Sequence, residues 1–436
     1  MVLASGIIDE LRLTDYGLRY LDVDPVAVAV GWDAEPAFVQ WRDIDRTLDG
    51  LAAIDPAVAR AYRRYLEAAL PVARLVLAVQ DGRPTTRAIV ATAARHRLRG
   101  ARSVLAWARR SLLDVLGSFG LPPWIVAAAH TGGPAVWGLP PDHPGTGLGA
   151  LGLAMRHLVG VGRPVGGSGA LPDALAAYVR AHGGTIVTSA EVSGLVIEAG
   201  RARGVRLADG AQVSADTVVA ATDPQTVMDD WTRRWPTAEQ NGYESKVDAV
   251  VTSLPRFHAV PEQLQGIATT LVCPTPELMV RHLDRVSDPP MFLVNTPSVL
   301  DGSMRPSPGS HLLSLEVLWT PYALRGGWDG SPQPWRWLEQ LASICAPGLL
   351  EGIRDWRVMT PPDYEREFSL RRGYAPSFPG GVLDALLGRR RELTRYTTDV
   401  PGLYLTGAGA FPGAGVWGVS GRNAAATITR SVASAR

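Results

Sequence analysis

Residues 401–425, PGLYLTGAGAFPGAGVWGVSGRNAA, decide the fold of this chain. The apolar run Gly402–Thr406 is typical of a short buried strand, the loop Gly407–Gly418 is rich in glycine, and a helix is expected over Arg422–Val432. Glycines let a ligand approach the backbone closely, and a helix start offers free N–H groups to an anion. This order indicates a cofactor-binding α/β unit, although a plain strand-to-helix turn has the same pattern.

The middle of the chain carries a second α/β block. We expect a helix over Leu171–His182, closed by Gly183-Gly184, because glycine readily adopts the left-handed conformation that ends a helix. The β-rich segments after it are Thr185–Ser189, Glu191–Glu198, Ala202–Leu207 and Thr217–Ala221, and Asp209-Gly210 is a hairpin signal among them. The order predicts a helix that feeds a parallel strand, with a small antiparallel meander inserted.

The remaining sequence divides into a helical part and a mixed part. Ile54–Leu116 has apolar residues at three- and four-residue spacing, which predicts two or three amphipathic helices, and a further helix is expected over Leu148–Val159. Between residues 231 and 357 the expected elements are strands at Ala249–Leu254, Met291–Thr296 and Leu312–Leu318 and a helix around Trp335–Ile344. This mixture indicates a separate α+β lobe.

Composition argues against several classes of protein. With 43 basic and 42 acidic residues among 436, the chain has no basic field for nucleic acid, which is therefore not an expected partner. Cys273 and Cys345 offer no redox pair, zinc-finger spacing or disulfide framework, which fits a reducing compartment. The first residues do not resemble a signal peptide, and glycines and prolines break the uncharged stretch Val115–Pro141. We expect a cytoplasmic protein and leave peripheral membrane contact open.

Several nucleotide and metal motifs occur without the context that they need. The GxGxxG string Gly147–Gly152 follows a proline-rich turn instead of a strand, and Gly413–Gly418 begins seven residues after its strand. The Walker-like spacing over Gly162–Ser168 lacks the phosphate-binding lysine. The eight histidines show neither HxH nor HExxH spacing. These patterns predict no metal site, and they leave the catalytic residues unknown.

Taken together, the glycine-rich segments resemble those of the phytoene-desaturase-like FAD oxidoreductases. Residues 401–425 are similar to the C-terminal flavin segment of that family, and Gly166–Pro172 is similar to its glycine-rich helix entry. Its second FAD-domain block is matched by Thr185–Glu198, Ala202–Leu207 and Asp216–Pro224, and Ile7–Leu21 resembles the stretch shortly after its dinucleotide fold. The branch that the chain resembles most is the pyridine nucleotide-disulfide oxidoreductase domain-containing protein 2 type.

The resemblance implies an α/β fold with an α+β substrate lobe, built on a Rossmann-like FAD/NAD(P)-binding domain of the amine oxidase and phytoene desaturase type. It divides the chain into a mainly helical substrate or cap region at 1–160, FAD-domain segments at 161–228 and 366–436, and a substrate-binding lobe at 229–365. The implied activity is that of a desaturase or dehydrogenase that transfers hydride from a hydrophobic small molecule to flavin N5. Val115–Trp137 and Leu312–Trp319 are candidates for lining its apolar tunnel.

The resemblance also implies which residues bind FAD. In the family, the C-terminal segment presents its backbone to the flavin ring, and the following helix start lies near the pyrophosphate or the ring edge. Carried over to this chain, the cofactor-binding candidates are Val192, Gly407, Ala408, Gly413, Gly415, Val416, Gly421 and Arg422. Val192 is the candidate for a backbone contact to adenine, with a buried strand valine as the alternative interpretation.

The chain departs from the family at two places. Family members begin with a strand, a GxGxxG turn, a helix and a second strand, which together hold the ADP half of FAD. Such a unit needs roughly 30 residues, and only six precede Ile7 in this sequence. We expect one of three explanations: the recorded start of the sequence is too late, another polypeptide supplies the unit, or the protein no longer binds FAD. At Gly373–Gly381 a family histidine is replaced by residues YAPSFP. The alternative function is a non-catalytic or cofactor-free relative that acts as an interaction subunit or an isomerase.

The missing unit generates a prediction about FAD binding. Residues 1–436 alone are expected to bind FAD weakly or not at all, because a helix terminus contributes only about 0.3–2 kcal/mol to anion binding. Apolar strands left without neighbours are expected to favour a partner chain or self-association. Size-exclusion chromatography with titrated FAD measures both properties. A well-behaved monomer that binds FAD below micromolar concentration contradicts the expectation.

Overall fold

The computed structural model describes residues 5–33, 36–82, 85–227, 244–373, 382–413 and 418–435. Its largest sheet has seven strands in the order β13-β9-β12-β11-β10-β2-β3. These strands are β2 (Ala27–Gly31), β3 (Phe38–Gln40), β9 (Glu244–Val251), β10 (Thr270–Cys273), β11 (Met291–Asn295), β12 (His311–Leu318) and β13 (Ile353–Met359). Every neighbouring pair is antiparallel except β10 and β2, which run parallel.

The two faces of this sheet have different surroundings. On β9, Val247, Ala249 and Val251 are buried in a core that includes Trp337 and other residues of helix α11 (Gln333–Ser343). Residues that alternate with them point to the other face, because successive side chains of a strand lie on opposite sides. That second face packs on helices near β2 and β10, while near β9 and β12 it borders a cavity.

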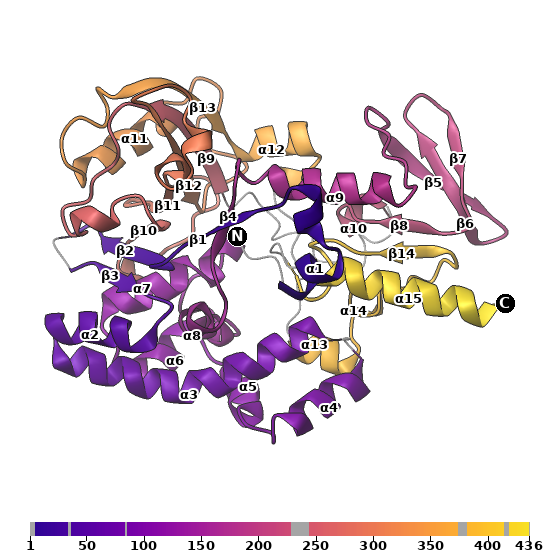
Figure 1. The fold of residues 1–436 in the computed structure, drawn as a ribbon, viewed down its shortest axis with the longest axis horizontal. Coiled ribbons are helices and arrows are strands. Elements are labelled where there is room, and N and C mark those ends of the chain that lie inside the picture. The colour runs from indigo at the N-terminus through magenta and orange to yellow at the C-terminus, as the bar shows by residue number, and fades with distance from the viewer. Residues whose placement is uncertain are drawn as a thin grey trace.

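A layer of helices lies beside the sheet and forms the lower part of the molecule in Figure 1. It contains α2 (Ile44–Ile54), α3 (Pro56–Asp81), α4 (Thr86–Arg95), α5 (Ala101–Trp107), α6 (Leu112–Gly117), α7 (Pro123–Thr131) and α8 (Leu151–Leu158). Helices were expected within 54–116 and are confirmed, but there are four of them instead of two or three. Gly100 accounts for one break, since it has φ +81° and a Cβ there would lie 2.8 Å from the Cα of Val72 on α3.

The third part of the molecule is the α/β block. Strand β14 (Leu403–Leu405) pairs in parallel with β8 (Val218–Ala220), and β5 (Val192–Glu198), β6 (Arg201–Leu207) and β7 (Gln212–Ser214) form the antiparallel meander. Helices α9 (Ala170–Ala181) and α15 (Val419–Ala435) belong to the same side of the molecule (Figure 1). The predicted strand within 402–406, the meander and both helices are confirmed. Helix α15 begins three residues before the expected Arg422.

Short elements connect these parts. Strands β1 (Tyr20–Asp22) and β4 (Gly162–Pro164) form a two-stranded antiparallel ladder that leads into the loop before α9. The remaining α-helices are α1 (Ser5–Glu10), α10 (Pro224–Val227), α12 (Pro361–Phe368), α13 (Val382–Leu387) and α14 (Arg391–Thr394). Among the described residues, no helix is both long enough and apolar enough to cross a bilayer.

Two strand predictions need correction. Thr185–Ser189 forms no strand, because its backbone meets no neighbouring strand among the described residues, and the side chain of Val187 is 71% exposed. The strand expected at Ala249–Leu254 is β9, which begins at Glu244 and ends at Val251. The first half of β9 has polar residues at every second position, so it does not form an apolar run that predicts a strand.

The large sheet contains strands from two of the predicted domains. Strands β2 and β3 lie within 1–160, the segment expected to be mainly helical, yet they complete the sheet formed by strands of 229–365. These two strands have only five and three residues, so they carry too little periodicity to stand out in a sequence. The domain bounds themselves stay a prediction.

Gly147 and Gly149 of the GxGxxG string at Gly147–Gly152 serve close packing, and this generates a stability prediction. A Cβ on Gly147 would lie 2.3 Å from the carbonyl oxygen of Trp107, whereas a Cβ on Gly117 meets nothing within 4 Å. Gly147→Ala is therefore expected to lower the free energy of unfolding by about 1–3 kcal/mol. Gly117→Ala, the matched control on helix α6, should be neutral or raise it by up to about 1 kcal/mol. Urea denaturation measures both, and equal effects contradict the packing argument.

Candidate functional site

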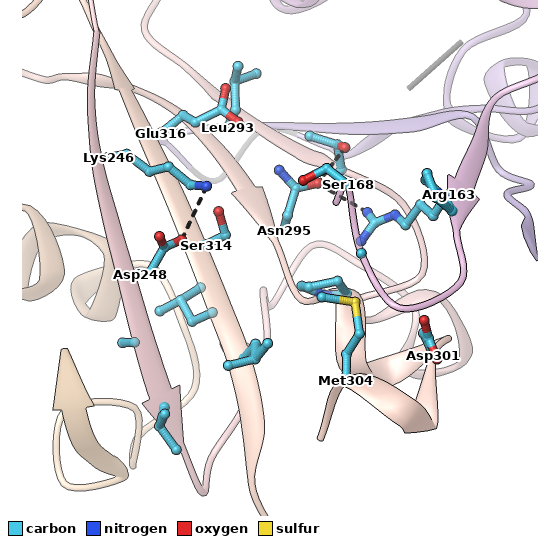
Figure 2. A pocket seen from close by; sticks show the side chains of 18 of the residues that line it. Arg163, Ser168, Lys246, Asp248, Leu293, Asn295, Asp301, Met304, Ser314 and Glu316 are labelled. Carbon is cyan, nitrogen blue, oxygen red and sulfur yellow. Dashed lines mark hydrogen bonds and ion pairs between the residues drawn. The ribbon is translucent and has the colours of Figure 1, made fainter. Parts of the chain in front are cut away.

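A cavity of about 790 Å³ lies between the second face of the large sheet and the loop that precedes helix α9. Strands β9, β11, β12 and β13 supply one wall, and Arg163 and Pro164 of β4 with Gly167 and Ser168 of the loop supply another. Figure 2 shows side chains from both walls directed into the space between them. Its volume is in the range of pockets that hold a drug-sized or cofactor-sized ligand.

Strand register gathers charged side chains on the β9–β12 wall. Lys246 lies opposite Glu316, and Asp248 lies between Ser314 of β12 and Arg357 of β13. The Nζ atom of Lys246 is 3.4 Å from Oδ1 of Asp248, and Nη2 of Arg357 is 3.2 Å from its Oδ2. Asp248 thus shares its charge between two cations, and Figure 2 shows its ion pair with Lys246.

Two glutamates beside this cluster hold protons more tightly than usual. Burial raises the pKa of Glu316, the ammonium of Lys246 opposes the rise, and the carboxylate of Asp248 adds to it. Burial also raises the pKa of Glu244 to about 7, with a further contribution from Glu316. The cavity therefore contains an acid, Glu316, that can keep or release a proton closer to neutral pH than an ordinary glutamate.

The opposite end of the cavity has a different polar group. Nη2 of Arg163 donates to Oδ1 of Asn295 at 3.1 Å, and Oγ1 of Thr269 donates to the same oxygen at 2.7 Å. The loop before α9 is held by Asp301, whose Oδ2 accepts a hydrogen bond of 2.7 Å from the backbone N–H of Gly166. These contacts join β4, β11 and the loop into one wall.

Apolar side chains fill the space between the two polar ends. They include Val23, Val161, Val250, Leu293, Leu312 and Met304. Of the segments predicted to line a tunnel, Leu312–Trp319 contributes Leu312, Ser314 and Glu316 to this cavity. Val115–Trp137 instead packs in the helical layer, where Leu116 and Ile125 are fully buried, because α6 and α7 pack against α3 and the sheet.

The predicted cofactor-binding residues of the glycine loop have varied surroundings. Gly407 has φ +91°, and a Cβ there would lie 2.7 Å from the carbonyl oxygen of Ala221, so the packing of the loop after β14 already requires glycine. Ala408 is exposed, and Gly413 has φ +118°. Gly415 and Val416 lie outside the described residues.

The other three predicted residues are on α15 and β5. Gly421 is the third residue of α15, and a Cβ there meets nothing within 4 Å. Arg422 donates from Nη2 to Oδ1 of Asp81 at 2.8 Å, and its Nη1 lies 3.8 Å from a carboxylate oxygen of Glu10. Val192 opens β5 with its side chain 54% exposed, which is not the environment of a buried strand valine. The FAD-binding roles of these residues stay predictions.

The described residues fit the flavin part of FAD in two respects. Helix α9 begins directly after the Gly166–Gly169 loop, and α15 begins at Val419, so each offers backbone N–H groups without intrahelical acceptors. A Cβ built on Gly166, Gly169 or Gly421 meets nothing within 4 Å, which shows open space beside both helix starts. A flat ring has room to approach these backbones.

The structure combines an α/β fold of the amine oxidase type with a sheet-lined cavity next to glycine-rich helix starts. Residues 45–322 match the profile of the flavin containing amine oxidoreductase family, and the chain belongs to this family. The α/β fold and the family resemblance inferred from sequence are confirmed.

Known relatives agree with this assignment. Pyridine nucleotide-disulfide oxidoreductase domain-containing protein 2 of Mus musculus is 32% identical over 326 residues, which cover 67% of this chain and 56% of the mouse protein. Phytoene desaturase (lycopene-forming) of Pantoea ananas is 25% identical, over 62% of this chain and 56% of that protein. Prolycopene isomerase of Arabidopsis thaliana is 26% identical, over 62% of this chain and 45% of that protein. The chain thus spans about half the length of the curated relatives it matches.

A solved structure shows the same fold. Putrescine oxidase bound to putrescine superimposes with a TM-score of 0.54 at 15% sequence identity, over 99% of this chain and 87% of the other. At that identity the likeness concerns the fold alone.

The charged residues of the cavity were not predicted from the sequence. Lys246, Asp248 and Glu316 occupy alternate positions of strands that are paired on both sides, where apolar residues are the rule. Polar residues at a period of two within 244–250 and 314–316 are the signal that could have found them. Arg163 and Asn295 carry no such pattern, because each is a single polar residue next to a turn.

The raised pKa of Glu244 generates a prediction about stability and pH. The folded protein binds a proton at Glu244 up to about pH 7, and the unfolded chain releases it near the ordinary value, so stability falls as pH rises through this window. Glu244→Gln removes the group, and its free energy of unfolding relative to the natural protein should rise between about pH 5 and pH 8 by on the order of 2–3 kcal/mol. Denaturation curves at both pH values measure this.

Glu351→Gln, at an exposed position, is the control and should show no such trend. A constant difference between Glu244→Gln and the natural protein at all pH values refutes the raised pKa.

Proposed function

We propose that this protein is an FAD-dependent oxidoreductase that removes hydride from a hydrophobic substrate and passes it to flavin N5. The observation that carries the proposal is the cavity itself, which places apolar walls and a protonatable cluster beside the glycine loop that opens α9. A relative whose name states phytoene desaturation supports a hydrophobic substrate. FAD, when bound, supplies the hydride acceptor.

The chain's own residues have separable tasks in this proposal. Backbone groups of Gly166–Gly169 and the first turn of α15 would hold the flavin, and Leu293, Leu312 and Val250 would orient an apolar substrate and exclude water. Glu316 and Asp248, set by Lys246 and Arg357, would hold or accept a proton on the β9–β12 wall. Such a group balances charge when a substrate loses a proton together with hydride.

A second candidate is cofactor-free isomerisation. The observation in its favour is that Glu316, Asp248 and Lys246 form an acid–base cluster in an apolar cavity without help from a cofactor. A relative named prolycopene isomerase points the same way. Product that forms in the absence of FAD distinguishes this candidate from the first.

We also propose that a second chain, either a partner or another copy, covers the edge near residues 185–219, and that peripheral membrane contact brings hydrophobic substrate to the cavity. The apolar side chains of Ile186, Val187 and Val219 are exposed there, beside the two-stranded β14–β8 sheet. Exposed apolar surface of this kind is typical of an interface.

Substrate-driven bleaching of the flavin tests the proposed function. Protein saturated with FAD is mixed without oxygen with a panel of isoprenoid and polyketide-like compounds, and the visible flavin band should fade with a member of the panel. Leu312→Trp fills the cavity and should slow the fading by about tenfold or more, a barrier increase of roughly 1.4 kcal/mol. Leu283→Trp, at a site that is 68% exposed, should leave it unchanged.

Bleaching that is equally fast in Leu312→Trp would contradict the assignment of this cavity to the substrate. Conversion of substrate in the absence of FAD, with no bleaching when FAD is present, favours the isomerase.

A further inference from the structure

The end of the cavity beside β4 presents hydrogen-bond donors. Oδ1 of Asn295 already accepts from Arg163 and from Thr269, so the amide directs its Nδ2 group, which can only donate, away from them. Arg163 has five N–H bonds and gives one side of its guanidinium to Asn295. Arg163, Asn295 and the hydroxyl of Ser168 all line the cavity, and Figure 2 shows Arg163 reaching across from β4 toward Asn295.

The charge of Arg163 has no counter-charge in the described part of the chain. Its hydrogen-bond partner there is the neutral amide of Asn295, and no carboxylate forms an ion pair with it. Asp301 is occupied instead, because its oxygens accept from the backbone N–H groups of Gly166 and Ser303. Burial lowers the pKa of Arg163, and no acidic neighbour opposes the effect. A largely buried guanidinium without an anion is costly, so a ligand that brings one is favoured.

We propose that Arg163 and Asn295 form a subsite for the carboxylate of an amphipathic acid whose hydrocarbon body lies along Leu293, Leu312 and Val250. The inference rests on the proposed function only in that it takes this acid to be the substrate. It narrows the substrate class from any hydrophobic molecule to an apolar molecule with one terminal carboxylate.

A carboxylate matches this subsite better than other polar groups. It accepts hydrogen bonds at two oxygens in one plane, which suits the fork of a guanidinium and an adjacent amide donor. A phosphomonoester carries about −1.5 to −2 charges at neutral pH, more than one guanidinium neutralises, in a cavity that also holds Asp248 and Glu316. A hydroxyl or ester would leave the charge of Arg163 without a partner.

The other residues that line the cavity determine that the body of the ligand is apolar. Leu293 and Asn295 point to the same face of β11, and Leu293 is paired with Glu316 of β12. Leu312 and its partner Val250 extend the apolar wall across β12 and β9. An acid anchored at Arg163 therefore has hydrocarbon surface available in the same cavity. The volume of about 790 Å³ accommodates a hydrocarbon chain of medium length.

Binding of decanoate and decanol to the protein without added FAD tests the subsite and does not depend on turnover. Isothermal titration calorimetry should show decanoate binding at least about tenfold more tightly than decanol, because only the carboxylate makes a charge-assisted hydrogen bond to Arg163. Arg163→Met should abolish this preference, and Arg163→Lys should keep part of it. Arg354→Met, at an exposed position of β13 that is not among the lining residues, should keep the full preference.

Equal affinity for decanoate and decanol in the natural protein overturns the proposal without any variant, so it does not depend on the folding of Arg163→Met. Tighter binding of decyl phosphate than of decanoate overturns the choice of carboxylate. A preference that survives in Arg163→Met but disappears in Arg357→Met, which removes the cavity arginine of β13, moves the anion site to β13 and also overturns the assignment. Flavin bleaching by neutral isoprenoids, with no decanoate preference, would uphold the proposed function and refute this subsite.

Discussion

The antiparallel pairing of β9 with β12 is the constraint on which the site depends. It sets Lys246 opposite Glu316 and Asp248 opposite Ser314, so that a line of polar groups crosses the middle of the sheet. Side chains alternate along a strand, and a slip of one residue would therefore turn Lys246 and Asp248 into the core under α11. Val247, Ala249 and Val251 prevent the slip, because they fill that core with Trp337 and Leu341. The same register thus specifies the hydrophobic core on one face and the cavity on the other.

A second set of contacts holds the C-terminal segment in place. Arg422 of α15 pairs with Asp81 at the end of α3, and the side-chain amide of Asn423 donates to the carbonyl oxygen of Gly82 at 3.1 Å. Phe411 and Leu405 join the core of the helical layer. Residues more than 300 positions apart therefore meet, and Phe411 and the start of α15 are fixed relative to the helices. These contacts give Arg422 a structural role whether or not it also approaches a cofactor.

The sequence predicts the local elements of this protein better than its site. Strand β14, the β5–β7 meander and α9 have strong signals in apolar runs, a hairpin dipeptide and a glycine stop, and all are confirmed. Thr185–Ser189 has an equally strong strand signal, but a strand also needs a neighbour, which no local pattern can show. The cavity escaped prediction for a similar reason: Arg163, Lys246 and Asn295 come from three separate segments, and only the sheet register and the β1–β4 ladder bring them together. The sequence shows the glycine-rich motifs plainly, but a glycine in such a motif need not bind a cofactor. At Gly147 and Gly407, close contact with a neighbouring backbone is enough to require glycine.

The central claim is that the cavity on the polar face of the large sheet is where a substrate meets the flavin. A crystal structure of the protein saturated with FAD tests it most directly. The account predicts that the flavin ring lies against the Gly166–Gly169 loop and the start of α15, with one face open to the cavity that Leu293 and Lys246 line. A flavin ring bound elsewhere, or separated from this cavity by packed side chains, would contradict the account.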